Sequence, residues 1–235
     1  MQDEDFPLDS FYELRNDLNL RKSNFNNFIS YYLDLKNVFN IIKLSLLRLN
    51  DHIDKFNDYN KLFLLYKDGK TSPNDEKEML KLEIHFVYFK LDCKTLFIQS
   101  SIFMDKIGKF LSVLFQDRGP ESKNYFHFVN SINKYKNKGI DELIRLINAY
   151  PVMYDELKNI RDNYIIHQSK ETLGSVIGPD YFSISLGTRK GGMPKFVSIS
   201  NEYIDVFTSQ LKSYLKNLNK YLCNNVEKIP FRISR

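Results

Sequence analysis

The stretch HFVYFKLDCKTLFIQSSIFMDKIGKFLSVLF, residues 85–115, is the most apolar part of the chain and decides its fold class. Its apolar residues occur on nearly all sides of a helix, which is typical of a helix buried in a protein core. Charged residues interrupt it at Lys90, Asp92, Lys94, Asp105, Lys106 and Lys109. It therefore lacks the roughly 20 consecutive apolar residues of a membrane-spanning helix. We expect a central buried helix that begins near Pro73 and ends near Phe115.

Other long helices are predicted on both sides of this stretch. Apolar residues recur near a period of 3.6 between about residues 27 and 67, which predicts one long helix there. Shorter helices are expected at about residues 122–134 and from residue 141, and a last helix over about residues 201–226. The apolar face of this last helix consists of Ile204, Phe207, Leu211, Tyr214, Leu215, Leu218 and Leu222. Only nine Gly and seven Pro in 235 residues argue against a β-sandwich or propeller, which need frequent turns.

The glycines concentrate in one place, just before the last helix. Five of the nine lie between Gly174 and Gly192, where residues 181–186 and 196–199 alternate with period two. This pattern predicts one small β-hairpin over about residues 180–200. The predicted fold class is therefore all-α: a helical bundle in a single domain, residues 1–235, with one hairpin inserted before the C-terminal helix.

Composition excludes several kinds of site. The two cysteines, Cys93 and Cys223, lie far apart, so neither a disulfide framework nor a cysteine-based zinc site is expected. The four histidines all lack the Glu three residues upstream that helical di-iron proteins use, and we predict no metal and no cofactor. The start of the chain has no secretory-signal pattern, so a cytoplasmic location is expected. The net charge of +5 is compatible with a polyanionic partner but does not require one.

One helical segment, KNIRDNYIIHQ at residues 158–168, combines residues that can carry chemistry. At about 100° per residue, His167 continues an apolar stripe and Arg161 projects roughly 120° away from it. The stripe consists of Met153, Leu157, Ile160 and Tyr164. Taken alone, His167 is more simply interpreted as a core histidine hydrogen-bonded within the bundle. Taken alone, Arg161 is interpreted as a surface arginine paired with Asp155 or Asp162.

The spacing of Arg161 and His167, on a helix of about residues 151–169 late in an all-helical chain, resembles the signature of the HEPN superfamily (higher eukaryotes and prokaryotes nucleotide-binding domain). The order of long helices over most of residues 25–225 is also similar to the HEPN arrangement. By this resemblance Arg161 and His167 are the catalytic pair, and Asp162 and Asn163 support them. The common family form has Asn directly after the Arg, where this chain has Asp162.

The resemblance implies an endoribonuclease that needs no metal and acts as a homodimer, with the motif helices of two protomers forming one composite cleft. It implies a toxin or antiphage-defence effector, restrained by an antitoxin or another protein encoded nearby. In members regulated by adenylylation a Tyr stands two residues after the His, where this chain has Ser169. The basic residues Arg189, Lys190 and Lys195 of the predicted hairpin are candidates for gripping RNA, or form an ordinary solvated loop.

Two other interpretations remain open. The chain is alternatively a non-catalytic HEPN-like module that binds nucleotide or RNA or serves in dimerisation. In a third interpretation it is a plain helical scaffold, in which Arg161 is paired away from any groove and His167 is enclosed.

Overall fold

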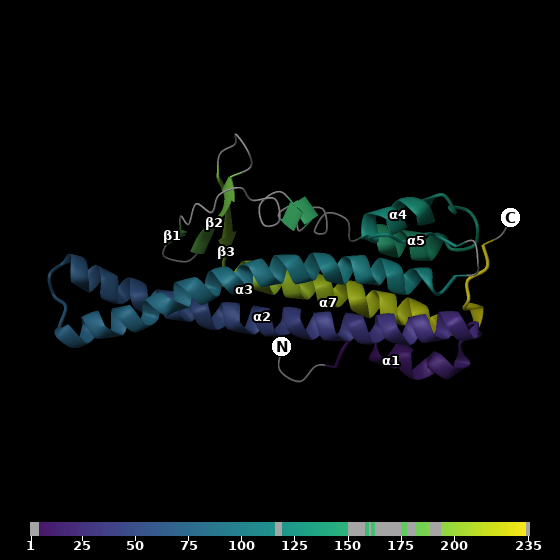
Figure 1. Cartoon of the computed structure of the whole chain (residues 1–235), viewed down its shortest axis with the longest axis horizontal. Coiled ribbons are helices and arrows are strands. Elements are labelled where there is room, and N and C mark those ends of the chain that lie inside the picture. The colour runs from purple at the N-terminus through teal and green to yellow at the C-terminus, as the bar shows by residue number, and fades with distance from the viewer. Residues whose placement is uncertain are drawn as a thin grey trace. The chain divides into compact units, whose positions relative to one another are not determined.

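The computed structural model describes residues 5–115, 119–149, 158–159, 161–162, 175–177, 182–188 and 194–233. Its main elements are helices, as Figure 1 shows. They are α1 (Asp9–Glu13), α2 (Lys22–Lys67), α3 (Pro73–Ser112), α4 (Tyr125–Asn133), α5 (Asp141–Asn148) and α7 (Asn201–Asn224), with short 3₁₀ helices at Leu14–Asp17 and Val226–Lys228. The prediction of an all-α fold class is confirmed. Among the described residues, no helix combines the length and apolarity needed to cross a membrane.

The connection between α2 and α3 follows from its local sequence. Gly69 takes the left-handed conformation, φ +66°, that closes a helix. The backbone N–H groups of Gly69 and Lys70 donate to the carbonyls of Tyr66 and Leu65, which is the Schellman pattern of a helix C-terminus. Ser72 then caps α3: its Oγ accepts from the N–H of Asp75 at 3.2 Å. These residues make the chain reverse between two long helices.

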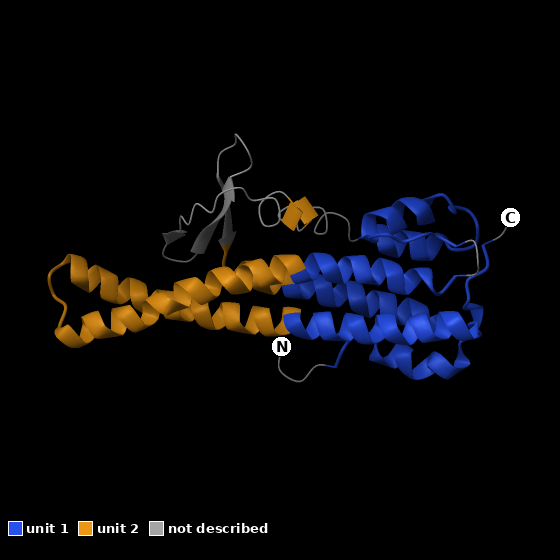
Figure 2. Ribbon diagram, in the orientation of Figure 1, with its two compact units in different colours: residues 1–41, 99–157, 208–235 blue, residues 42–98, 158–207 orange. Residues whose placement is uncertain are grey.

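The chain divides into two compact units, coloured in Figure 2. Unit 1 comprises residues 1–41, 99–157 and 208–235, and unit 2 comprises residues 42–98 and 158–207. Each unit is therefore built from segments that are distant in sequence. The expectation of a single domain over residues 1–235 stays a prediction.

The core of unit 1 is rich in aromatic side chains. The ring of Phe110, in α3, lies 5.4 Å from that of Phe28 and 6.3 Å from that of Phe11, measured between centroids. The Tyr125 hydroxyl donates to the carbonyl of Ile147 at 2.9 Å and lies 3.1 Å from the Tyr214 hydroxyl. Leu211, Tyr214, Leu215, Leu218 and Leu222 of α7 are all buried in this unit. The apolar face expected for the last helix thus packs into a core.

Gly108 lies at a close contact within unit 1. A Cβ atom on Gly108 would lie 3.0 Å from the Ser122 Oγ and 3.2 Å from the backbone Cα of Tyr125. A helical Gly→Ala change usually stabilises a protein by about 0.5–1 kcal/mol. Here we expect Gly108→Ala to lower the free energy of unfolding by about 1–3 kcal/mol, because the added methyl overpacks this contact.

Urea denaturation of the two proteins measures this difference. Ser209→Ala, at an exposed position of α7, is the control and should change stability by less than about 0.5 kcal/mol. A Gly108→Ala protein as stable as the parent would show that the contact has room to relax.

The strands form an antiparallel sheet in the order β1 (Ser175–Ile177), β2 (Phe182–Thr188), β3 (Pro194–Ile199). Ser183 pairs with Ser198, and the register shifts between Ser185 and Thr188. The predicted description, a two-stranded hairpin over about residues 180–200, omits β1, which pairs with the other edge of β2. Three residues are too few for period-two alternation to reveal a strand.

Candidate functional site

The structure describes part of the predicted motif helix. Lys158 and Asn159 are helical, and Arg161 and Asp162 lie in a wide, π-helical turn. His167 and Asn163 lie outside the described residues, so the distance between His167 and Arg161 stays open. Arg161, the arginine of the motif, thus has a π-helical backbone conformation.

Arg161 and Asp162 form an ion pair. The Arg161 Nε donates to the Asp162 Oδ1 at 2.7 Å, and the two side chains are 16% and 34% exposed. A pair with Asp162 was one of the alternatives open for Arg161 in the sequence. The arginine is more enclosed than a surface residue, and the Asp162 carboxylate both orients the guanidinium and offsets part of its charge.

Of the three basic residues expected to contact RNA, one lies among the described residues. Arg189 and Lys190 lie outside the described residues. Lys195 is the second residue of β3. Their role as RNA contacts stays a prediction.

A second group of polar residues lies between α2 and α3 in unit 2. The His52 Nδ1 is 3.0 Å from the His85 Nδ1, and the His52 Nε2 is 3.1 Å from the Asp92 Oδ2. Arg48 donates to the other oxygen of Asp92. His52 and Asp92 are each 5% exposed, whereas Asp51, beside His52 in sequence, is exposed. We call Arg48, Asp51, His52, His85 and Asp92 the histidine cluster.

Burial affects the pKa of one member of the histidine cluster, His52. It lowers the pKa of His52 below the usual histidine value, although the carboxylate of Asp92 acts in the opposite direction. A neutral His52 carries one ring proton. If its Nε2 donates that proton to Asp92, its Nδ1 has a lone pair directed toward His85.

Sequence inspection missed this cluster because its members lie on two helices. His52 and His85 are 33 residues apart, and His52 and Asp92 are 40 residues apart. Neither His52 nor His85 has the Glu three residues upstream that marks a metal site within one helix. Asp92 could have indicated the cluster from the sequence. It is a charged residue within the most apolar stretch, and a buried charge needs a partner.

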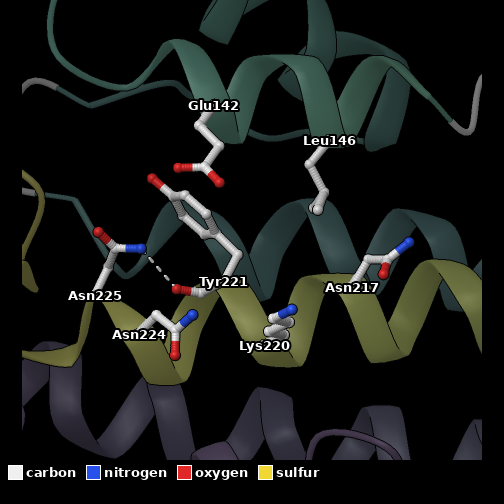
Figure 3. A pocket seen from close by; sticks show the side chains of 7 residues that line it. All are labelled: Glu142, Leu146, Asn217, Lys220, Tyr221, Asn224 and Asn225. Carbon is white, nitrogen blue, oxygen red and sulfur yellow. Dashed lines mark hydrogen bonds between the residues drawn. The ribbon is translucent and has the colours of Figure 1, made fainter.

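A third candidate is a hollow of about 410 Å³ in unit 1, shown in Figure 3. Its lining residues are Glu142, Leu146, Asn217, Lys220, Tyr221, Asn224 and Asn225. Glu142 and Leu146 point from α5 toward the side chains of α7. Burial and, second, the Glu142 carboxylate raise the pKa of Tyr221 to about 12, so its hydroxyl stays protonated at neutral pH. The hollow is polar but has no convergent catalytic pair among these residues.

Comparison with known proteins assigns no family. No protein-family model matches the chain. No solved structure matches it. Reticulocyte-binding protein homolog 1 of Plasmodium falciparum (isolate 3D7) is 25% identical over 188 residues, which cover 74% of this chain and 5% of that protein. The chain thus spans only a small part of the length of this relative, and the similarity is too low to show a family.

Proposed function

We propose that the chain is a metal-independent endoribonuclease of the HEPN type that cuts RNA with Arg161 and His167. The observation that carries the proposal is the spacing of these residues on a helix late in an all-α chain. The enclosed, oriented guanidinium of Arg161 supports it. A homodimer would bring two motif helices to one cleft.

The two side chains have the chemistry that RNA cleavage needs. His167 takes the proton from a ribose 2′-OH, whose oxygen then attacks the adjacent phosphorus and displaces the 5′-oxygen of the next nucleotide. A protonated histidine returns a proton to that leaving oxygen. Arg161 stabilises the extra negative charge on the pentacoordinate phosphate. The products are a 2′,3′-cyclic phosphate and a 5′-OH, and DNA is not cut because it lacks the 2′-OH.

Incubation of the purified chain with RNA in EDTA tests this proposal. We expect cleavage to continue in EDTA and the new ends to be 2′,3′-cyclic phosphate, identified by mass spectrometry. DNA of the same sequence is the control and should remain intact. Cleavage that stops in EDTA and returns only with added metal, or that leaves 3′-OH ends, would contradict the mechanism.

The ion pair with Asp162 favours a second candidate, a non-catalytic HEPN-like module that binds RNA or nucleotide. Asp162 offsets part of the charge that Arg161 would present to a phosphate. Such a module shows no turnover but binds RNA with a salt-dependent affinity. Each phosphate contact removed by mutation should reduce the salt slope by about one unit.

The resemblance to the HEPN superfamily also implies the biological setting that we propose. In this proposal the chain is a cytoplasmic toxin or antiphage effector, restrained by an antitoxin or another protein encoded nearby. Arg189, Lys190 and Lys195 would add phosphate contacts to the RNA.

A further inference from the structure

We propose that His52, His85 and Asp51 bind a divalent transition-metal ion, with Zn²⁺ as the best match. The proposal is independent of the ribonuclease activity and concerns other residues. It starts from three potential ligand atoms, one from each side chain, that all lie within 4.8 Å of one another.

The separation of the two histidines suits a shared ion. Zn²⁺ binds histidine nitrogen at about 2.0–2.1 Å, so two nitrogens on one tetrahedral ion lie about 3.3 Å apart. The Nδ1 atoms of His52 and His85 are 3.0 Å apart, which requires only a small rotation of either ring. Asp51 is exposed and its carboxylate can approach without disturbing the core.

The surroundings of His52 match those of a metal-binding histidine. Such a histidine usually donates its second ring N–H to a carboxylate, which fixes the ring and directs the other nitrogen to the ion. The Nε2 of His52 is 3.1 Å from the Asp92 Oδ2, and Arg48 holds the other oxygen of that carboxylate. Asp92 and Arg48 are therefore positioning residues that present the Nδ1 of His52 toward His85.

The ligand types select the class of ion. Two imidazoles and one carboxylate suit Zn²⁺, Ni²⁺ or Cu²⁺, whereas Mg²⁺ and Ca²⁺ prefer an all-oxygen set. Three protein ligands leave one tetrahedral position for water. Without an ion, the short contact would instead be a hydrogen bond from the His85 Nδ1–H to the His52 Nδ1.

Calorimetric titration of the metal-stripped full chain with Zn²⁺ tests the site. We expect binding of one equivalent per chain, and at least tenfold weaker binding in His85→Ala. His127→Ala removes a histidine of α4 in unit 1 and should bind as the parent does. Mg²⁺ should give no signal. Absence of Zn²⁺ binding by the parent, or full binding by a folded His85→Ala, would overturn the proposal.

Two further variants keep the result interpretable. Asp92→Asn should weaken Zn²⁺ binding about 10–100-fold, because His52 loses its orienting carboxylate. Arg161→Ala should bind Zn²⁺ normally, which separates this site from the proposed ribonuclease. Circular dichroism confirms that each variant is folded, and a folded Asp92→Asn with unchanged affinity would refute the positioning role. Co²⁺ in place of Zn²⁺ reports tetrahedral coordination directly through its visible absorption.

Discussion

Replacement of His167 by alanine is expected to lower the rate of RNA cleavage about 10²–10⁴-fold, the usual contribution of general acid–base catalysis. The loss should appear in the cleavage step, because His167 moves protons and is not required for RNA affinity. Initial rates at saturating RNA, together with RNA affinity from fluorescence anisotropy, separate the two effects. Arg161→Ala should also reduce cleavage strongly, because the guanidinium stabilises charge that develops only in the transition state.

Matched controls exist for both substitutions. His127→Ala removes a histidine and Arg145→Ala an exposed arginine, both in unit 1, and each should retain cleavage within a few-fold of the parent. If His167→Ala and Arg161→Ala both cleave RNA at the parental rate, the proposed mechanism is wrong. If none of the proteins cleaves but all bind RNA, the non-catalytic module is the better interpretation.

A mixture of the two inactive variants examines the composite cleft. An Arg161→Ala protomer retains its histidine, and a His167→Ala protomer retains its arginine. If the arginine of one protomer acts with the histidine of the other, a mixed dimer restores one working pair and part of the activity. No recovery after exchange of subunits would mean that both groups act from the same chain.

Phe110→Ala is expected to lower the free energy of unfolding by about 3–5 kcal/mol, the usual cost of removing a buried phenylalanine side chain. Phe110 is 0% exposed and its ring contacts those of Phe11 and Phe28. The loss combines removal of apolar contacts with the cavity that remains. Urea denaturation followed by circular dichroism measures the shift in midpoint.

Phe126→Ala provides a control of the same residue type in the same unit. Phe126 lies in α4 and is 49% exposed, so its removal should cost no more than about 1 kcal/mol. If Phe110→Ala lowers the free energy of unfolding as little as Phe126→Ala does, the core around Phe110 closes over the missing ring.

Much of the fold could be predicted because it depends on local periodicity. The last helix was expected from its apolar face, and Leu215 and Leu218 are fully buried. The connection before α3 was expected, because one helix was predicted to end at about residue 67 and the next to begin near Pro73. β1 was missed, because a three-residue strand exists only through its pairing with β2.

One candidate site could be predicted from local sequence and the other could not. The Arg161 motif could be found from spacing within one helix, and its ion pair with Asp162 was one of two pairings expected. The histidine cluster could not be found, because its metal-ligand geometry depends on the register of α2 against α3. A shift of one helical turn, about 5.4 Å, would separate the ring nitrogens of His52 and His85 beyond any shared ion.

The helical class, the approximate helix limits and the Arg161 motif could be read from the amino-acid sequence, since they depend on neighbours a few positions apart. Which distant side chains meet depends on the tertiary structure. The alignment of His52 with His85 and Asp92, and the close approach of α4 to Gly108, arise from packing between elements. Packing free energy is the sum of many weak contacts, and it is not encoded by any single local pattern.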